Sequence, residues 1–234
     1  MAGRRFEREV RAGLGDVTPT GRVRLDALAR LAQDLAFADV DDAGTAEEAL
    51  WVVRRAEVAV ARFPRFNEPL AGRTWCSGLG SLWAERTTTL GDGVSIVAVW
   101  VHLDLSSGRP IPFSEREIAV YGASAGGRRV RARLQHPGPP AGAERSPWEF
   151  RAAELDLAGH VNNAAYWTPL EEELLEAAAE PARVRAEIEY RTPAQPGPHE
   201  VLRAGDRRWI AAPSGDVHAS VVLETAGPPG GASA

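Results

Sequence analysis

The chain carries one pattern twice: a glycine-containing turn, an amphipathic helix and then a series of strand-like segments. Gly21-Arg22-Val23 opens the first helical stretch, and Gly159-His160-Val161 opens the second in the other half of the chain. The strand-like segment after each helix repeats a second motif, Arg55-Ala56-Glu57-Val58 in the first half and Arg185-Ala186-Glu187-Ile188 in the second. These matches predict a fold made by tandem duplication of one helix-and-sheet unit.

In the first half, apolar residues recur at helical spacing over 25–36. The opposite face of this helix is expected to carry Arg24, Arg30, Gln33 and Asp34. Segments rich in Val, Trp and Thr follow and are separated by Gly- and Pro-containing turns, as is typical of antiparallel strands; they span 51–62, 72–79, 83–90 and 94–105. Because these strands are long and the single helix is of similar length, we expect the sheet to curl around the helix.

The second half repeats this order with shorter strands. A Gly-, Pro- and Arg-rich stretch precedes it, and a second apolar stripe at helical spacing runs from Ala164 to Ala178. Strand-like segments are predicted at 148–153, 183–191, 199–204, 207–211 and 216–224. The expected organisation is a first unit at 1–123, a linker at 124–147, a second unit with a smaller sheet at 148–226, and a loose tail at 227–234.

Composition narrows the classes of function. The formal net charge of −5 gives no reason to expect a nucleic acid as the main partner. The most apolar stretch, 94–101, is too short to span a membrane, and the first ten residues lack the apolar core of a signal peptide. The single cysteine, Cys76, excludes an internal disulfide and fits a reducing cytoplasm. The histidines outside the second turn have no partner at metal-ligand spacing, so no metal or cofactor is expected.

The turn before the second helix concentrates chemically active side chains. It contains Asp156 and His160, whereas the first copy has Thr18 and Arg22 at the same places. Two of the three asparagines of the chain, Asn162 and Asn163, also lie here. A helix start presents free N–H groups and the positive end of the helix dipole, which together could bind a developing oxyanion. The alternative is that these residues only cap the helix and pack at the turn.

The turn at 156–166 resembles the signature of hotdog-fold thioesterases, Asp-Leu-Ala-Gly-His-Val-Asn-Asn-Ala-Ala-Tyr. Further segments resemble the acyl-ACP thioesterase family of plants and bacteria; they are 51–58, Phe63-Pro64, 72–78, Glu85-Arg86 and 188–191. The resemblance implies an α+β tandem (double) hotdog, with two long helices each wrapped by an antiparallel β-sheet. It also implies hydrolysis of fatty acyl-ACP to free fatty acid and acyl carrier protein (ACP), which ends chain elongation, at one site in the second unit.

The sequence departs from the plant pattern at two places. Ala158 stands where the plant enzymes have Asn, and Thr192-Pro193-Ala194 replaces an Arg-Glu-Cys segment. No cysteine nucleophile is therefore available there, and Cys76 is expected to be a small core residue. The effect of these replacements on catalysis is open at this point.

The residues that remain favour a mechanism resembling that of simpler hotdog thioesterases. Asp156 either activates water as a general base or attacks the thioester carbon, and the sequence does not choose between these. His160 is expected to orient Asp156 or water, or to stabilise the leaving thiolate. The candidates for binding the oxyanion are the backbone N–H groups near Val161 and Asn162. Gly159, which has no side chain, would let the substrate come close to the backbone, and Asn163 is a further candidate for positioning it.

The predicted linker contains the strongest basic run of this acidic chain, and an ACP is acidic. Arg128, Arg129, Arg131 and Arg133 are therefore candidates for ACP docking. Two alternatives remain open: a hotdog acyl-CoA thioesterase using the same aspartate, and a non-catalytic acyl-binding hotdog protein. The preferred acyl chain length and the choice between a monomer and a homodimer are also open.

Overall fold

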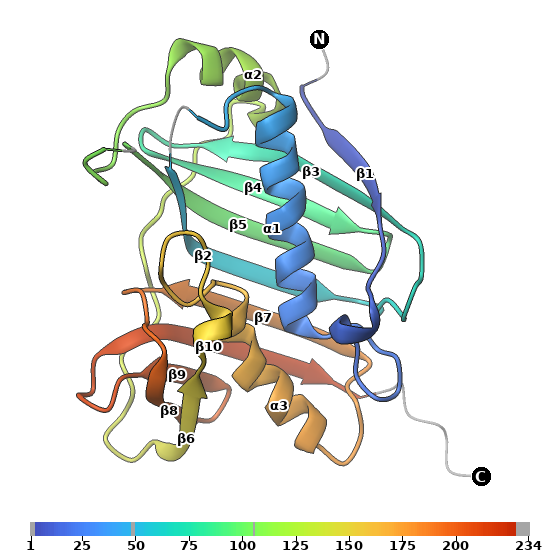
Figure 1. Ribbon diagram of the computed structural model, residues 1–234, viewed down its shortest axis with the longest axis vertical. Coiled ribbons are helices and arrows are strands. Elements are labelled where there is room, and N and C mark those ends of the chain that lie inside the picture. The colour runs from blue at the N-terminus through green and yellow to red at the C-terminus, as the bar shows by residue number, and fades with distance from the viewer. Residues whose placement is uncertain (1–2, 48–49, 105, 228–234) are drawn as a thin grey trace.

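The computed structural model describes residues 3–47, 50–104 and 106–227. Its centre is a ten-stranded antiparallel sheet in the order β1-β3-β4-β5-β2-β7-β10-β9-β8-β6 (Figure 1). The strands are β1 (Phe6–Val10), β2 (Leu50–Val60), β3 (Leu70–Leu79), β4 (Trp83–Leu90), β5 (Val94–Leu103), β6 (Glu144–Phe150), β7 (Arg183–Tyr190), β8 (Gly197–Ala204), β9 (Arg207–Ala211) and β10 (Val217–Ala226).

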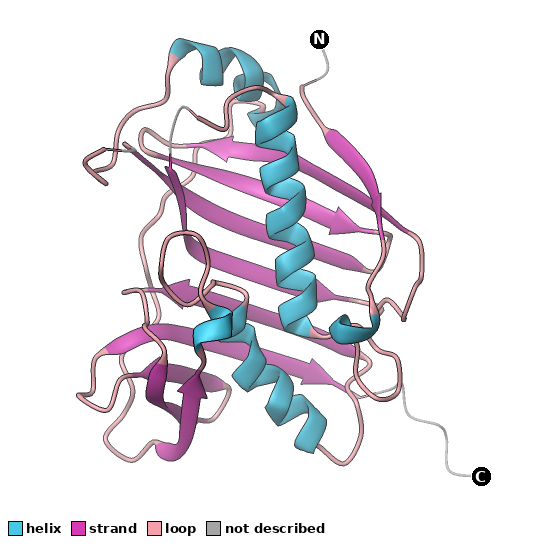
Figure 2. Ribbon diagram, viewed as in Figure 1, coloured by secondary structure: helices cyan, strands magenta, loops and turns pink. Residues whose placement is uncertain are grey.

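The helices lie on one face of this sheet (Figure 2). They are α1 (Leu25–Asp42), α2 (Glu115–Ala125) and α3 (Thr168–Glu176), with short 3-10 turns at η1 (Leu14–Asp16), η2 (Ala152–Glu154) and η3 (Ala165–Trp167). The long helix α1 crosses the first-half strands and contacts η3 and α3 of the second half. Within the described residues, no helix is both long and apolar enough to cross a membrane.

The apolar stripe predicted for the first helix packs against the sheet. Leu25 and Leu28 are completely buried, and Leu35 is almost so. The polar face of the helix differs in part from the prediction. Arg24 and Arg30 do not simply extend into solvent, because both bind the buried carboxylate of Asp26. Gln33 was expected to face away from the core. It instead is half-buried and lines two adjoining cavities.

The two units share one continuous sheet, whereas the sequence predicted a separate, smaller second sheet. The joining strands β2 and β7 run antiparallel, with Ala56 opposite Ile188 and Glu57 opposite Glu187. The two copies of the repeated strand motif therefore pair with each other at the centre of the sheet. This pairing satisfies the main-chain N–H and C=O groups that each unit would otherwise leave unpaired at a sheet edge.

The second helix is short, so the expectation of two long helices is not confirmed. The helix α3 has 9 residues against 18 in α1. It ends at Glu176, Ala177 is already extended, and Leu175, predicted on the buried stripe, is 39% exposed. Pro181 follows closely and disfavours helical backbone at the residue before it, which limits how far the helix could continue.

The helix α2 was not predicted, although its capping signal is present in the sequence. The Ser114 hydroxyl accepts a hydrogen bond from Glu117 N–H, the Glu117 carboxylate accepts one from Ser114 N–H, and Gly126 ends the helix with φ of 58°. The predicted linker then runs along the other face of the sheet. The indoles of Trp83 and Trp209 donate to its carbonyls. The predicted tail, 227–234, lies outside the described residues except for Gly227.

Candidate functional site

The helix-opening turn has the same backbone conformation in both halves. In the second half, Asp156 N–H donates to His160 O at 3.0 Å and Gly159 N–H donates to Asp156 O at 3.0 Å. In the first half, the corresponding bonds join Thr18 to Arg22 and Gly21 to Thr18 at 2.8 and 2.9 Å. Both glycines have positive φ, 74° and 84°, which explains why glycine recurs at this position. The internal repeat inferred from the sequence is therefore present in the structure.

One oxygen of the Asp156 carboxylate is held, and the other has no partner among the described residues. Its Oδ1 accepts the Ala158 N–H at 2.9 Å, and the side chain is half-buried. The backbone N–H of residue 158 is thus what positions Asp156, so the replacement of the plant Asn by Ala158 leaves this contact intact. In the part of the chain that the structure describes, no hydrogen bond joins the Asp156 carboxylate to the His160 imidazole, and the imidazole has no other polar partner there.

Two backbone groups that the sequence suggested for oxyanion binding are already occupied. Val161 N–H donates to Ala194 O at 3.1 Å, and Asn162 N–H donates to Glu154 O at 2.8 Å. Both bonds hold the turn against neighbouring segments, so neither N–H is free for a thioester oxygen. The Asn162 side chain caps the following turn by accepting Ala164 N–H at 2.8 Å. The N–H of Asn163 has no partner among the described residues and remains a candidate donor.

Two buried tyrosines fix the turn to the end of β7. Tyr166 Oη accepts Ala194 N–H at 2.8 Å, and Tyr190 Oη donates to Asn163 O at 2.9 Å. Burial raises the pKa of Tyr166 to about 12, and the nearby Asp156 charge adds to this. Burial also raises the pKa of Tyr190. Both phenols therefore keep their protons and act as rigid hydrogen-bonding groups. Ala194, which replaces a cysteine of the plant pattern, contributes both its main-chain groups to this anchor.

The turn leads to two adjoining cavities that are partly open to the surface. Asn163, Ala164 and Trp167 line the smaller, of about 40 Å³, which lies between the second half and α1. The larger, of about 360 Å³, is bordered by α1, α2 and the first-half strands and is mainly apolar. The cavities share four lining residues, Gln33, Ala36, Arg86 and Trp100. An extended apolar group attached near Asn163 could therefore pass through both.

Cys76 lines the larger cavity and fits the expected role of a core residue. Its side chain is buried, and burial raises the pKa of its thiol above the ordinary range. A thiol that resists ionisation is a poor nucleophile.

The corresponding turn of the first half is filled. The Arg22 guanidinium, which replaces His160, is 2% exposed and binds the Glu171 carboxylate of α3 at 2.5 Å. Glu171 Oε2 also accepts the first N–H of α1, that of Leu25, at 2.9 Å. This turn therefore joins the two halves and offers no free titratable group.

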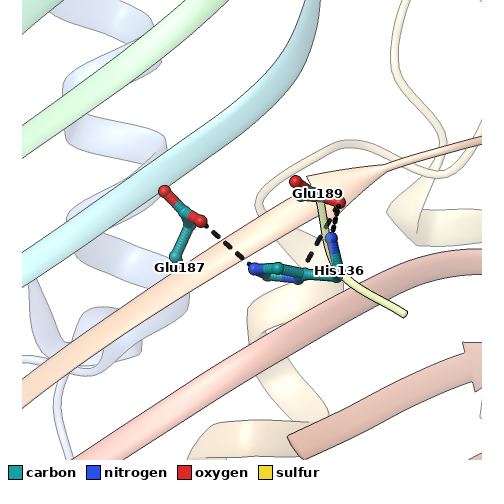
Figure 3. Close-up of side chains that lie close together, drawn as sticks. All are labelled: His136, Glu187 and Glu189. Carbon is teal, nitrogen blue, oxygen red and sulfur yellow. Dashed lines mark hydrogen bonds and ion pairs between the residues drawn. The ribbon is translucent and has the colours of Figure 1, made fainter. Parts of the chain in front are cut away.

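A third cluster of charged groups lies on the outer face of the sheet (Figure 3). His136 Nε2 lies 3.1 Å from Glu187 Oε1, and the completely buried Glu189 carboxylate accepts the N–H groups of Gln135 and His136 at 2.6 and 2.9 Å. Candidate ligand atoms of His136, Glu187 and Glu189 lie within 4.8 Å of one another. Both carboxylate oxygens of Glu189 accept linker N–H groups, so the cluster fastens the linker to β7. Sequence spacing could not reveal it, because the fold alone brings His136 beside β7.

The described fold is the hotdog fold. Family models for the acyl-ACP thioesterase N-terminal domain and C-terminal domain match residues 3–121 and 139–202. These matches cover more than half of the chain, which therefore belongs to the acyl-ACP thioesterase family, and it is a thioester hydrolase of acyl-ACP.

The chain is also similar to individual proteins in sequence or in fold. An uncharacterized protein of Mycobacterium tuberculosis is 26% identical over 193 residues, covering 80% of this chain and 77% of the relative. The crystal structure of an acyl-ACP thioesterase from Bacteroides thetaiotaomicron has a TM-score of 0.76 at 16% identity, covering 94% of this chain and 98% of the other. The 12:0-ACP thioesterase from Umbellularia californica has a TM-score of 0.73 at 17% identity, covering 96% and 98%. These two structures show the shared fold.

Proposed function

We propose that the loop at 156–163 is the catalytic site and that the two cavities hold the acyl chain of acyl-ACP. The observation that carries this proposal is the position of the loop. It holds an aspartate with one unengaged carboxylate oxygen, and Asn163 at its end lines the smaller cavity. A thioester placed at this end of the loop would have its acyl chain directed toward α1 and its carrier outside.

In the proposed reaction the free Oδ2 of Asp156 acts on the thioester. It takes a proton from the attacking water, and the tetrahedral adduct then breaks its C–S bond to release the carrier thiolate. Alternatively it adds to the carbonyl carbon and expels the carrier thiolate, which leaves a mixed anhydride that water then hydrolyses. The Asn163 N–H is the proposed donor to the developing oxyanion, in place of the two occupied N–H groups. His160, whose imidazole has no partner among the described residues, would orient water or protonate the leaving thiolate.

The linker offers a basic groove for the carrier. Arg55, Arg128, Arg129, Arg131 and Arg133 line a groove of about 690 Å³ on the outer face of the sheet. Arg128 is engaged with the Glu85 carboxylate, so it contributes less free charge than the sequence suggested. Three other exposed arginines of the groove have no ion pair among the described residues; they are Arg129, Arg131 and Arg133.

The groove is also connected to the proposed catalytic loop through β7. The main-chain N–H of Gln135, which lines the groove, donates to Glu189 on one face of β7. On the other face, the next residue, Tyr190, binds Asn163 of the loop. A carrier seated in the groove could thus extend its flexible phosphopantetheine arm around the end of β7. We therefore propose ACP docking at Arg129, Arg131 and Arg133.

Replacing these three arginines with alanine should raise KM for acyl-ACP about tenfold and leave kcat nearly unchanged, since rim charges act mainly on encounter. The effect should shrink as salt is added, because ions screen exposed charges. Steady-state kinetics at low and high ionic strength measure both. The matched control replaces three arginines of other surfaces, Arg73, Arg145 and Arg183. An equal rise in KM in the control would show that the groove does not bind the carrier. A rise in KM of the groove variant that salt does not reduce would show the same.

The carrier comparison tests the function itself. We expect free fatty acid to be released from acyl-ACPs with a higher kcat/KM than from acyl-CoAs of the same chain length. Faster release from acyl-CoA would favour an acyl-CoA thioesterase. Tight binding of acyl-ACP without release would identify an acyl-binding protein. The same panel reports the preferred chain length, and size-exclusion chromatography with light scattering separates a monomer from a homodimer.

We also propose the cytoplasm as the location of the enzyme. The single cysteine is buried and free, so no disulfide ties this fold to an oxidising compartment.

A further inference from the structure

Three polar side chains surround the junction of the two cavities. Gln33 comes from α1, Arg86 from β4 and Trp100 from β5, and each lines both cavities. The helix and the sheet thus place polar groups around a passage whose other walls are mainly alanine and aliphatic side chains. We call these three residues the polar collar.

The protein leaves hydrogen-bonding capacity of the polar collar unused. Arg86 Nη1 donates to Asp39 Oδ2 at 2.6 Å and to Thr74 Oγ1 at 3.3 Å, whereas its Nε and Nη2 find no partner among the described residues. The Gln33 amide also has no hydrogen bond to any described residue. Trp100 Nε1–H is buried and unpartnered within the same set.

An unsubstituted hydrocarbon chain does not match this passage. It would displace water from the amide and the guanidinium without replacing the lost hydrogen bonds, which is unfavourable. An oxygen on the chain would instead accept hydrogen bonds there, and a bond from the guanidinium would be charge-assisted. Asp39, which is 1% exposed, pairs with both Arg86 and Arg4, and Arg4 also pairs with Asp42. Two carboxylates thus balance the two guanidinium groups, so a neutral hydroxyl or keto oxygen fits better than a carboxylate.

The collar also lies close to the proposed catalytic loop. Asn163 of the loop lines the same small cavity as Gln33 and Arg86. An acyl chain that enters the smaller cavity beside Asn163 therefore meets the collar before it reaches the larger cavity. The oxygen that reaches these groups should be carried by one of the first carbons after the thioester.

We propose that this thioesterase prefers acyl groups with an oxygen on the β-carbon, namely 3-hydroxyacyl or 3-oxoacyl groups, over saturated acyl groups of equal length. The polar collar is the specificity-determining element. This inference rests on the proposed function, because it assumes that the thioester lies at the loop 156–163 and that the chain enters the cavities.

The test compares three acyl-ACPs of equal length that carry a saturated, a 3-hydroxy or a 3-oxo acyl group. For the wild-type enzyme, kcat/KM should be at least about tenfold higher for one or both oxygenated substrates, since a site that offers hydrogen bonds rejects an analogue unable to form them. In Gln33→Leu and in Arg86→Met this preference should fall toward unity, chiefly through a gain on the saturated substrate and a loss on the oxygenated ones.

Two features of the chain sharpen the comparison. Thr89→Val is the matched control, because Thr89 lies on β4 like Arg86 but lines neither cavity. This variant should keep the wild-type preference. Arg86→Met loses the contact with Asp39 and could unfold, whereas Gln33→Leu breaks no described hydrogen bond. Gln33→Leu therefore decides the outcome if Arg86→Met is unstable in a thermal melt.

The outcomes separate this inference from the proposed function. Equal or faster cleavage of the saturated acyl-ACP by the wild type, still dependent on Asp156, would overturn the inference alone. An equal loss of kcat on all three substrates in Gln33→Leu would also overturn it, because Gln33 would then act on the thioester carbonyl. Failure to hydrolyse any of the three would overturn both.

Discussion

Asp156→Asn should lower kcat on acyl-ACP about a thousandfold, in the range that removal of a general base or nucleophile costs. The amide oxygen of Asn can still accept the Ala158 N–H, which Asp156 Oδ1 accepts at 2.9 Å, so the turn keeps its conformation. What the variant loses is the second carboxylate oxygen as a base or nucleophile. Stopped-assay release of free fatty acid measures kcat, and a thermal melt checks the fold.

The matched control is Asp206→Asn, the same chemical change in an exposed turn between β8 and β9. It should retain wild-type turnover. If Asp156→Asn keeps more than about a tenth of the activity with an unchanged melting temperature, Asp156 has no place in the mechanism. A large loss of melting temperature in Asp156→Asn alone would instead assign Asp156 a structural role at the turn.

Isotope labelling separates the two roles of Asp156. In a single turnover in ¹⁸O-water, attack of water on the Asp156 carbonyl of a mixed anhydride would leave ¹⁸O in that carboxylate. A general base would send all of the label into the released fatty acid, and so would attack of water on the acyl carbonyl of the anhydride. Label in Asp156 therefore identifies the covalent route, and its absence requires a second measurement. Trapping of an acyl-enzyme by hydroxylamine provides an independent measurement, because only the covalent route forms an activated acyl group on the protein.

Most strand positions could be predicted because alternation and turn residues are local signals. The segments predicted at 83–90 and 207–211 coincide with β4 and β9. The joining of the two sheets through β2 and β7 is not a local signal, since it depends on how the two edge strands meet in space. The length of α3 was overestimated because the alanines after Glu176 have high helix propensity, yet the backbone is already extended at Ala177.

The proposed site also has a part that the sequence predicts and a part that depends on tertiary contacts. The sequence singled out Asp156 and His160 because they differ from Thr18 and Arg22 at matching positions of the repeat. It could not show that the N–H of Val161 is occupied, since its acceptor, Ala194 O, lies in a different segment. The polar collar was missed for a similar reason. Helical periodicity placed Gln33 on the outer face, whereas the space beside Arg86 and Trp100 makes it a cavity residue.

The buried pair of Arg22 and Glu171 should be the most sensitive ionic contact of the fold. Both side chains are 2% exposed, and they join the turn before α1 to α3. Arg22→Met leaves the Glu171 carboxylate buried without its guanidinium, which should cost about 3–5 kcal/mol of unfolding free energy. For a chain of this size the melting temperature should fall by about 10 °C. Chemical denaturation and a thermal melt measure the two quantities.

The loss should depend on pH. Burial raises the pKa of Glu171 above its ordinary range, and the Arg22 guanidinium opposes this effect in the wild type. Arg22→Met removes that guanidinium, so the pKa of Glu171 should rise further. A group whose folded pKa is raised stabilises the fold below its unfolded pKa and loses that contribution as pH rises through the folded pKa. Arg22→Met should therefore be closer to the wild type at pH 5 than at pH 8, and the reverse order would contradict the burial of an unpaired carboxylate.

A double replacement separates two explanations of this loss. Either the ion pair itself stabilises the fold, or the loss comes only from leaving one buried charge without its partner. Arg22→Met combined with Glu171→Leu removes both charges and should recover most of the lost stability, because apolar side chains can replace a buried ion pair. The exposed pair of Arg145 and Glu200 provides the control, and Arg145→Met should cost under about 1 kcal/mol. If the double variant also keeps kcat on acyl-ACP, the filled turn of the first half takes no part in catalysis. A loss of kcat in a stable double variant would show that this turn positions the catalytic loop through α3.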